Sequence, residues 1–476
     1  MSTLLYPPNI DWELTFACNH NCIHCYNYWR KQDSYDVYRK NRDYYIECAE
    51  RIIQSNPVSV QITGGEPLAV WDLAKDAIQM LLAAGIYVSI NTNATLVTDE
   101  IAQFLGENKI DAFVSFPCCR AEIFDYIVNS KGAFPRAIAG IQKLIDYGVR
   151  ISLNMVVTRI NLPYVYETAK YIHDTFNLSY FSATKASFPQ NADSEFRSQM
   201  LNCTEFNKML GEMLRVKRDF SMRVDSAWVY SLCGFSCEDI RKQFGFNRKC
   251  GCGKYSFVID PDGNMKACGC DSRTYGNILK ESFSVGISKM TIWHDGSLLA
   301  PECKTCTALK YCGGGCRSDS YSTHGDYCTM DSTADPKRKN CVISAIDQVA
   351  RYDKDMLLMR NPEAQIQQEN GFVRISYRSN YEFISNLASE FIIKNDKFAV
   401  WQLLEISTES VDEVYNWIDK LISKKLIRLC THSENEKLVH ISVPKFELFA
   451  SPYISESTSQ FICDYAGANY NSKRFM

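Results

Sequence analysis

The chain has 476 residues, which is too many for one ordinary domain and suggests roughly two to four. Its formal net charge of −3 gives no reason to expect a nucleic acid or a membrane surface as partner. No apolar run reaches the roughly 18 residues that a membrane span needs, and the N-terminus lacks the basic start of a secretory signal. We therefore expect a cytoplasmic, reducing location, where the 21 clustered cysteines predict metal ligands rather than disulfides.

The first part of the chain, to about residue 185, alternates strand-like and helix-like segments. Strands are predicted at 11–16, 58–63, 86–91, 111–116, 150–157 and 178–183. Residues 67–84 predict a helix with Pro67 in its first turn and Gly85 at its end. Apolar strands that alternate with helices indicate a parallel sheet, either an incomplete barrel or a doubly wound sheet. Both folds bind ligands at the C-terminal ends of the strands.

The rest of the chain divides into three stretches of different composition. Residues 190–245 are more polar and mostly helical in pattern, whereas 246–345 are rich in Cys and Gly and poor in long periodic segments. Ligand bonds can replace a large core in such a module. A further small domain is predicted from strands at 371–379, 390–396 and 440–448 and helices at 398–406 and 410–427, the last with Ser410 as N-cap. The tail, 455–476, is predicted to be loop or disordered.

The first cysteine cluster is Cys18, Cys22 and Cys25, in the sequence CNHNCIHCY directly after the first predicted strand. Three thiolates on one short loop can hold three irons of a four-iron cluster and leave the fourth iron open to a ligand, whereas a closed electron carrier normally uses four cysteines. The alternative is a zinc site completed by His20 or His24.

Together with Gly64-Gly65-Glu66-Pro67 at the end of the next strand, this loop resembles the radical S-adenosylmethionine (SAM) superfamily over residues 9–185. The resemblance implies a partial (β/α)6 barrel, with Cys18, Cys22 and Cys25 holding a [4Fe–4S] cluster whose open iron binds SAM. It further implies a set of SAM contacts on the cysteine loop and at later strand ends: His24, Gly64, Gly65, Glu66, Pro67, Asn93, Ser115 and Asn154. Two departures make the substrate side atypical: His24 replaces a usual aromatic residue, and Ser115 begins Ser-Phe-Pro-Cys rather than Ser-Leu-Asp-Gly.

The second cysteine block reads CKTCTALKYCGGGC at 303–316 and follows an upstream Cys-x12-Gly-x4-Cys. This array resembles the SPASM domain, which holds auxiliary [4Fe–4S] clusters. By that resemblance one cluster lies on Cys303, Cys306, Cys312 and a later cysteine, for which we favour Cys341 over Cys328. The other lies on Cys250, Cys268 and Cys316, with Cys252, Cys237, Cys233 or an open site as the fourth position. Structural zinc is the alternative for the whole block.

Four domains are therefore expected: a radical SAM core at 8–190, a helical bridge at 191–245, a SPASM domain at 246–350 and a C-terminal domain at 360–476. The last weakly resembles the small winged-helix-like domains that bind leader peptides at a sheet edge. A packing or dimerisation domain is the alternative.

The resemblances imply a maturase that cleaves SAM to a 5′-deoxyadenosyl radical and crosslinks or oxidises a ribosomally made precursor peptide. A flavodoxin- or ferredoxin-type protein would supply the electrons. One alternative is an anaerobic sulfatase-maturing enzyme, although that branch places Asp directly after the cysteine that matches Cys268, and Gly269 stands here. The other alternative is a non-catalytic binding protein whose fold is stabilised by structural zinc.

Overall fold

The computed structural model describes residues 7–27, 40–187, 192, 194–245, 249–338, 357–368, 372–409 and 411–430. Cys341, Ser410, the predicted strand at 440–448 and the tail lie outside these residues. By their internal contacts the described residues form two compact units, one containing those from 7 to 338 and the other those from 357 to 430.

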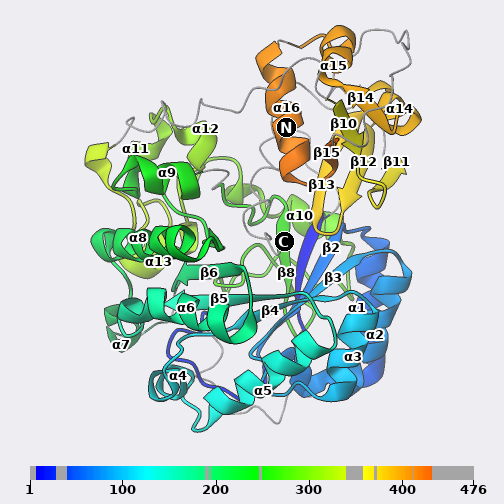
Figure 1. Cartoon of the computed structure of the whole chain (residues 1–476). Coiled ribbons are helices and arrows are strands. Elements are labelled where there is room, and N and C mark those ends of the chain that lie inside the picture. The colour runs from blue at the N-terminus through cyan, green and yellow to red at the C-terminus, as the bar shows by residue number, and fades with distance from the viewer. Residues whose placement is uncertain are drawn as a thin grey trace. The chain divides into compact units, whose positions relative to one another are not determined.

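The first unit is built on one nine-stranded sheet with the strand order β7-β6-β5-β4-β3-β2-β1-β8-β9. All neighbouring pairs from β7 to β8 are parallel, and only β9 runs antiparallel. The strands are β1 Asn9–Glu13, β2 Ser59–Thr63, β3 Tyr87–Thr92, β4 Asp111–Ser115, β5 Ile151–Val157, β6 Tyr180–Lys185, β7 Arg223–Asp225, β8 Ser256–Ile259 and β9 Met265–Lys266. Figure 1 shows β2 to β6 side by side in chain order.

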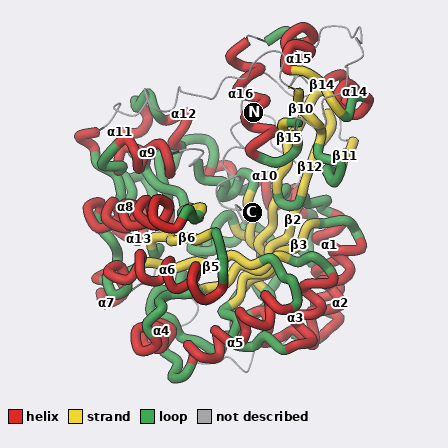
Figure 2. Tube along the Cα trace, in the orientation of Figure 1, coloured by secondary structure: helices red, strands yellow, loops and turns green. Residues whose placement is uncertain are grey.

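Helices connect the parallel strands and cover the sheet (Figure 2). Those up to β7 are α1 Arg42–Gln54, η3 Pro67–Val70, α2 Trp71–Ala83, α3 Asp99–Glu107, α4 Ala121–Val128, α5 Ala133–Asp146, η4 Leu162–Tyr164, α6 Val165–Phe176, α7 Ser194–Ser198 and α8 Cys203–Phe220. Their starts follow from local side-chain chemistry: Thr98, for example, accepts a hydrogen bond from the Ile101 amide and so caps α3. The six predicted strands are all present, and the α/β partial barrel with a parallel sheet is confirmed.

The predicted helix at 67–84 consists of the 3₁₀ turn η3 followed by α2. Gly85 follows it with a φ of +76°, a left-handed conformation that glycine adopts without steric cost. The first strand ends at Glu13 rather than at the predicted residue 16, because the chain from Leu14 onward turns along the Gly64-Gly65 segment.

Short elements make up the cysteine-rich part of the first unit. They are η5 Leu232–Gly234, α9 Glu238–Phe244, α10 Phe283–Ser288, η6 Thr291–Trp293, α11 Pro301–Lys304, α12 Leu309–Cys312, α13 Arg317–His324 and η7 Pro336–Arg338. This part is joined to the barrel, because β8 pairs in parallel with β1 from Asn9↔Ser256 to Trp12↔Ile259.

The second unit contains two three-stranded antiparallel sheets, ordered β14-β10-β15 and β11-β12-β13. Its elements are β10 Leu357–Arg360, β11 Gln365–Gln368, β12 Phe372–Tyr377, β13 Asn380–Ser385, α14 Asn386–Lys394, β14 Lys397–Ala399, α15 Val400–Ile406, α16 Val411–Ser423 and β15 Ile427–Leu429. A core of its own, which includes Leu403, Val414, Trp417 and Leu421, holds the unit together.

One predicted element of this unit is wrong. Residues 390–396, expected as a strand, mostly belong to helix α14. The Ser385 side chain caps this helix, and Ala388, Phe391 and Ile392 bury one helical face. The paired isoleucines resemble a strand locally, but the cap and the apolar spacing of three and four residues favour the helix.

Candidate active site

A cavity of about 310 Å³ lies inside the curved sheet of the first unit. Alternate residues of the strands line it, because successive side chains of a strand point to opposite faces. These lining residues are Asp11 and Glu13 of β1, Gln61 and Thr63 of β2, Asn91 of β3, Phe113 and Ser115 of β4, Asn154 and Val156 of β5, Thr184 of β6, and Ser256 and Val258 of β8. The last residues of β3 and β6, Thr92 and Lys185, line it as well. The cavity therefore opens where ligands of parallel α/β folds bind.

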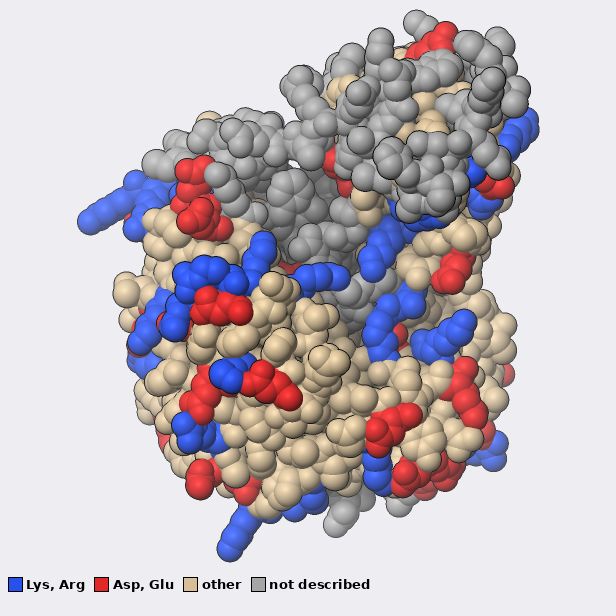
Figure 3. Space-filling view, viewed as in Figure 1, with Lys and Arg blue, Asp and Glu red and all other residues tan. Residues whose placement is uncertain are grey.

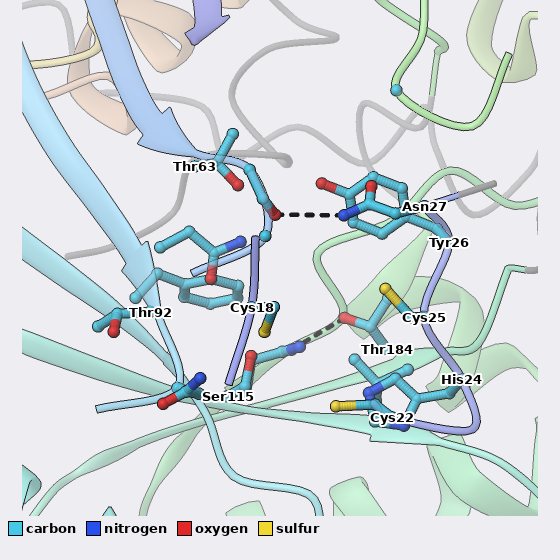
Figure 4. A pocket seen from close by; sticks show the side chains of 18 of the residues that line it. Cys18, Cys22, His24, Cys25, Tyr26, Asn27, Thr63, Thr92, Ser115 and Thr184 are labelled. Carbon is cyan, nitrogen blue, oxygen red and sulfur yellow. Dashed lines mark hydrogen bonds between the residues drawn. The ribbon is translucent and has the colours of Figure 1, made fainter. Parts of the chain in front are cut away.

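The predicted cluster ligands Cys18, Cys22 and Cys25 all line this cavity, and Figure 4 shows them around one part of it. Their loop is fixed to helix α4, because the amides of Asn21 and Ile23 donate to the carbonyls at the end of that helix, at 3.0 and 2.9 Å. The His20 amide also donates to the Cys18 sulfur at 3.4 Å. Amide donors of this kind stabilise thiolates that hold an iron–sulfur cluster.

Gly64 and Gly65 let the cysteine loop pass directly against the end of β2. A Cβ on Gly64 would lie 2.7 Å from the Thr15 carbonyl oxygen, and one on Gly65 would clash with the Ala17 carbonyl. The Gly65 amide donates to Thr15 at 2.7 Å and the Glu66 amide to Ala17 at 2.8 Å. Both glycines are thus required by close backbone packing, which positions the residue before Cys18.

Glu66 is almost wholly buried, and its carboxylate joins the second and third strand ends. Oε1 accepts from Thr92 Oγ1 at 2.6 Å and from the Leu68 amide at 3.2 Å, while Oε2 accepts from the Asn93 amide at 2.8 Å. Burial raises the pKa of Glu66 to about 7, although these three donors oppose the rise. The carboxylate therefore holds the ends of β2 and β3 together on the cavity wall.

The other predicted SAM contacts reach the same cavity. His24, Asn93, Ser115 and Asn154 all line it. The Asn93 side chain bonds to Asn19 and Thr95 and so ties the third strand end to the cysteine loop. Asn154 accepts from Thr184 at 3.0 Å. Pro67 is buried at the start of η3 and is not among the lining residues.

Sequence analysis missed Glu13, a buried residue of this cavity. One of its carboxylate oxygens, Oε2, has no hydrogen-bond partner in the described part of the chain. Burial raises the pKa of Glu13 to about 8, although Lys266 opposes the rise. Acidic residues at alternate positions of a strand, with apolar Ile10 and Trp12 between the polar positions, are the sequence signal that marks Asp11 and Glu13.

Two further groups of cysteines lie in the same unit. The first contains Cys250, Cys252, Cys268, Cys270 and Cys316, five residues where the prediction named four. The thiols of Cys252 and Cys270 donate to Cys268 and hold the pKa of that thiol well below its usual range, with Ser318 also in contact at 3.2 Å. Cys250 and Cys252 share a hydrogen bond between their side chains. Cys316 lies close enough to Cys250 and Cys268 for electrostatic interaction with them. Cys270 also lines the cavity.

The second group comprises Cys303, Cys306, Cys312 and Cys233, which line one small cavity. Cys328, the weighed alternative to Cys341, lies elsewhere: its thiol donates to the Ser297 carbonyl at 3.3 Å. In the described part of the chain every cysteine is a free thiol.

The donor chemistry of the three groups fits iron–sulfur clusters. One cysteine sulfur in each group accepts a hydrogen bond from a backbone amide at 3.4 Å. The pairs are Cys18 with the His20 amide, Cys312 with the Leu232 amide and Cys316 with the Asp319 amide. No set of three or more His, Cys, Asp or Glu in the described ranges has the geometry to hold a single metal ion.

The model of the radical SAM superfamily matches residues 12–172. The chain belongs to this superfamily. It is 27% identical to mycofactocin maturase MftC of Mycolicibacterium smegmatis over 335 residues, covering 67% of this chain and 80% of MftC. It is 30% identical to the uncharacterized protein MJ0907 of Methanocaldococcus jannaschii, covering 43% of this chain and 70% of MJ0907. The chain is thus homologous to peptide maturases of the SPASM type.

Two solved structures share the fold. One is anSMEcpe with bound AdoMet, at 20% identity and a TM-score of 0.56, covering 69% of this chain and 90% of that one. The other is Streptococcus suis SuiB bound to precursor peptide SuiA, at 15% identity and a TM-score of 0.54, covering 70% of this chain and 76% of SuiB. The barrel and the cysteine-rich part therefore follow a fold seen in these structures.

Figure 3 shows acidic and basic side chains mixed over the face of the first unit that it presents. Among the described helices, none is both long and apolar enough to cross a membrane.

Proposed function

We propose that this chain is a radical SAM maturase that crosslinks or oxidises a residue of a ribosomally made precursor peptide. The observation that carries the proposal is one cavity whose wall holds the Cys18, Cys22 and Cys25 loop and also Cys270 of the first auxiliary group. The homology of the chain to MftC supports a peptide substrate, as do the structures of anSMEcpe with bound Cp18Cys peptide and of SuiB with bound precursor peptide.

In this proposal Cys18, Cys22 and Cys25 hold a [4Fe–4S] cluster, and the strand ends around Glu66, Ser115 and Asn154 bind SAM. When bound, the cluster would supply the electron for reductive cleavage of SAM, and SAM would supply the oxidising group that removes hydrogen from the peptide. The chain positions the peptide residue inside the sheet and keeps water away from it. Gly269 and Cys270 line the same cavity, and Cys270 belongs to the first auxiliary group. After hydrogen abstraction, a cluster on that group would lie close enough to accept an electron from the peptide radical as the product forms.

The test of this chemistry is Cys22→Ala in the full chain, reconstituted with iron and sulfide under anaerobic conditions. The unchanged chain is expected to bind about twelve irons and to release 5′-deoxyadenosine from SAM after reduction by dithionite or a flavodoxin. Cys22→Ala should abolish that release, whereas Cys430→Ala, a matched substitution in the second unit, should not. Normal release from Cys22→Ala would refute the mechanism, and zinc without iron in the unchanged chain would favour a stapled binding protein.

The substrate class needs its own test. A short open reading frame beside the gene would supply the peptide, and mass spectrometry after turnover should show the loss of two hydrogens for each crosslink. A sulfatase peptide converted to formylglycine would favour the alternative maturase, but Gly269 gives that branch no side chain at its usual acidic position.

We further propose that the second unit binds the leader of the precursor peptide. Strand β11 is at the edge of its sheet, and Gln365, Gln367 and Gln368 are exposed along it, so an extended peptide could add as another strand. A fragment of residues 346–476 keeps β10 and the core of the unit intact. Calorimetry should detect the leader binding to this fragment and no binding of a scrambled leader; equal signals for both would exclude this role.

A further inference from the structure

The second auxiliary group brings together residues far apart in the chain. Cys303 lies in α11, Cys306 follows it, and Cys312 ends α12, so these three come from one stretch of ten residues. The fourth cysteine on the wall of their small cavity is Cys233 of η5, seventy residues before Cys303. A cubane cluster with four irons is closed when four cysteines bind it. The group therefore offers a complete ligand set within one cavity.

The position of Cys233 is fixed by its neighbours on both sides. The Leu232 amide donates to the Cys312 sulfur at 3.4 Å, which holds η5 against the end of α12. Gly234 packs so closely on the Thr333 carbonyl that a Cβ there would clash, and the Arg338 side chain donates to the Phe235 carbonyl at 3.0 Å. These three contacts hold residues 232–235 in place and so keep Cys233 on the same cavity wall as Cys303, Cys306 and Cys312.

The electrostatic environment agrees with this placement. Four cysteine side chains gather on the wall of this one small cavity. A site that places several thiolates together repels further negative charge unless a metal centre neutralises it. Cys237, four residues later, is exposed and lines neither cysteine cavity.

We propose that Cys233 is the fourth protein ligand of the auxiliary cluster held by Cys303, Cys306 and Cys312. This inference rests on the proposed function, since it takes that group to hold a [4Fe–4S] cluster. It reassigns Cys233 from the first auxiliary group, for which sequence analogy had weighed it, and removes the need for Cys341 as the closing ligand. A cluster closed by four thiolates has no open iron for substrate and acts as an electron carrier.

The experiment uses the full chain in which Cys18, Cys22 and Cys25 are replaced by Ala, so that only auxiliary clusters remain. After anaerobic reconstitution this parent should hold about eight irons per chain. Cys233→Ala in this parent should either lower the iron content by about four or, after mild oxidation, give the electron paramagnetic resonance signal of a three-iron cluster. Cys233→Ser, which keeps an oxygen ligand, should retain the iron with an altered spectrum.

Matched variants of the same parent decide between the cysteines. Cys237→Ala and Cys328→Ala should keep the iron content and the spectrum of the parent. If Cys233→Ala also keeps both while Cys341→Ala changes them, the assignment of Cys233 is overturned. Circular dichroism of each variant separates loss of a ligand from loss of the fold. A parent without iron would instead refute the proposed function itself, so the two failures are distinguishable.

Discussion

Gly65→Ala, which adds one methyl group, is expected to lower both the stability of the chain and the rate of SAM cleavage. A Cβ at this position would stand against the Ala17 carbonyl, well inside the 3.0 Å that real Cβ atoms keep from other atoms. The obstacle is backbone, so the loop leading to Cys18 has to move by about 1 Å. Overpacking of this kind costs about 1–3 kcal/mol of stability. A shift of about 1 Å in a catalytic group lowers the rate on the order of 100-fold.

Two assays check this prediction. Denaturant unfolding of the chain without clusters should show the lost stability, and release of 5′-deoxyadenosine from the reconstituted chain should show the lost activity. Gly211→Ala is the matched control, because Gly211 lies within helix α8 and has open space around it. That change should stabilise the chain by about 0.5–1 kcal/mol and leave the release unchanged. If Gly65→Ala behaves like Gly211→Ala, close packing is not the reason for the glycine.

Three further changes have definite expected results. Lys424→Met should destabilise the second unit by roughly 1–3 kcal/mol in denaturant unfolding, because Lys424 donates to the buried Glu382 at 2.7 Å and only Lys420, at 3.4 Å, would still pair with that carboxylate; a loss below about 1 kcal/mol would contradict this. Asn202→Ala should cost about 1 kcal/mol by removing the capping box of α8, and no change in unfolding would show that the cap contributes nothing. Because burial raises the pKa of Glu13 from 4.5 to about 8, the folded chain binds the proton more tightly, so the stability of the cluster-free chain should fall as pH rises through this range. Glu13→Gln should reduce that fall, and an identical pH profile for both chains would contradict it.

The sequence predicted the fold of the first unit well, because buried parallel strands and their helices have different apolar periods. It failed at residues 390–396, where Ile392 and Ile393 imitate a strand and only the Ser385 cap and the spacing of buried side chains reveal a helix. The intrinsic helix or strand propensity of a residue is a weak predictor where capping and tertiary packing determine which of the two forms.

The site was predictable to the extent that its ligands are close in sequence. The spacing of Cys18, Cys22 and Cys25 predicts one loop, and all three line the cavity. Cys233 cannot be assigned in this way, since its neighbours in space come from a segment seventy residues later. Glu13 was missed for a related reason: its importance depends on the curvature that turns one face of β1 into a cavity wall.

The cavity also explains why one unit carries both kinds of cysteine group. Tyr26 directly follows Cys25 and lines the cavity together with Cys270. The Cys270 thiol in turn donates a hydrogen bond to the sulfur of Cys268 in the first auxiliary group. Under the proposed function, a substrate in this cavity would lie between the loop of Cys18, Cys22 and Cys25 and the first auxiliary group. Oxidation of a peptide residue needs removal of a hydrogen atom and then of an electron, and under the proposed function this arrangement would place both steps on one bound residue.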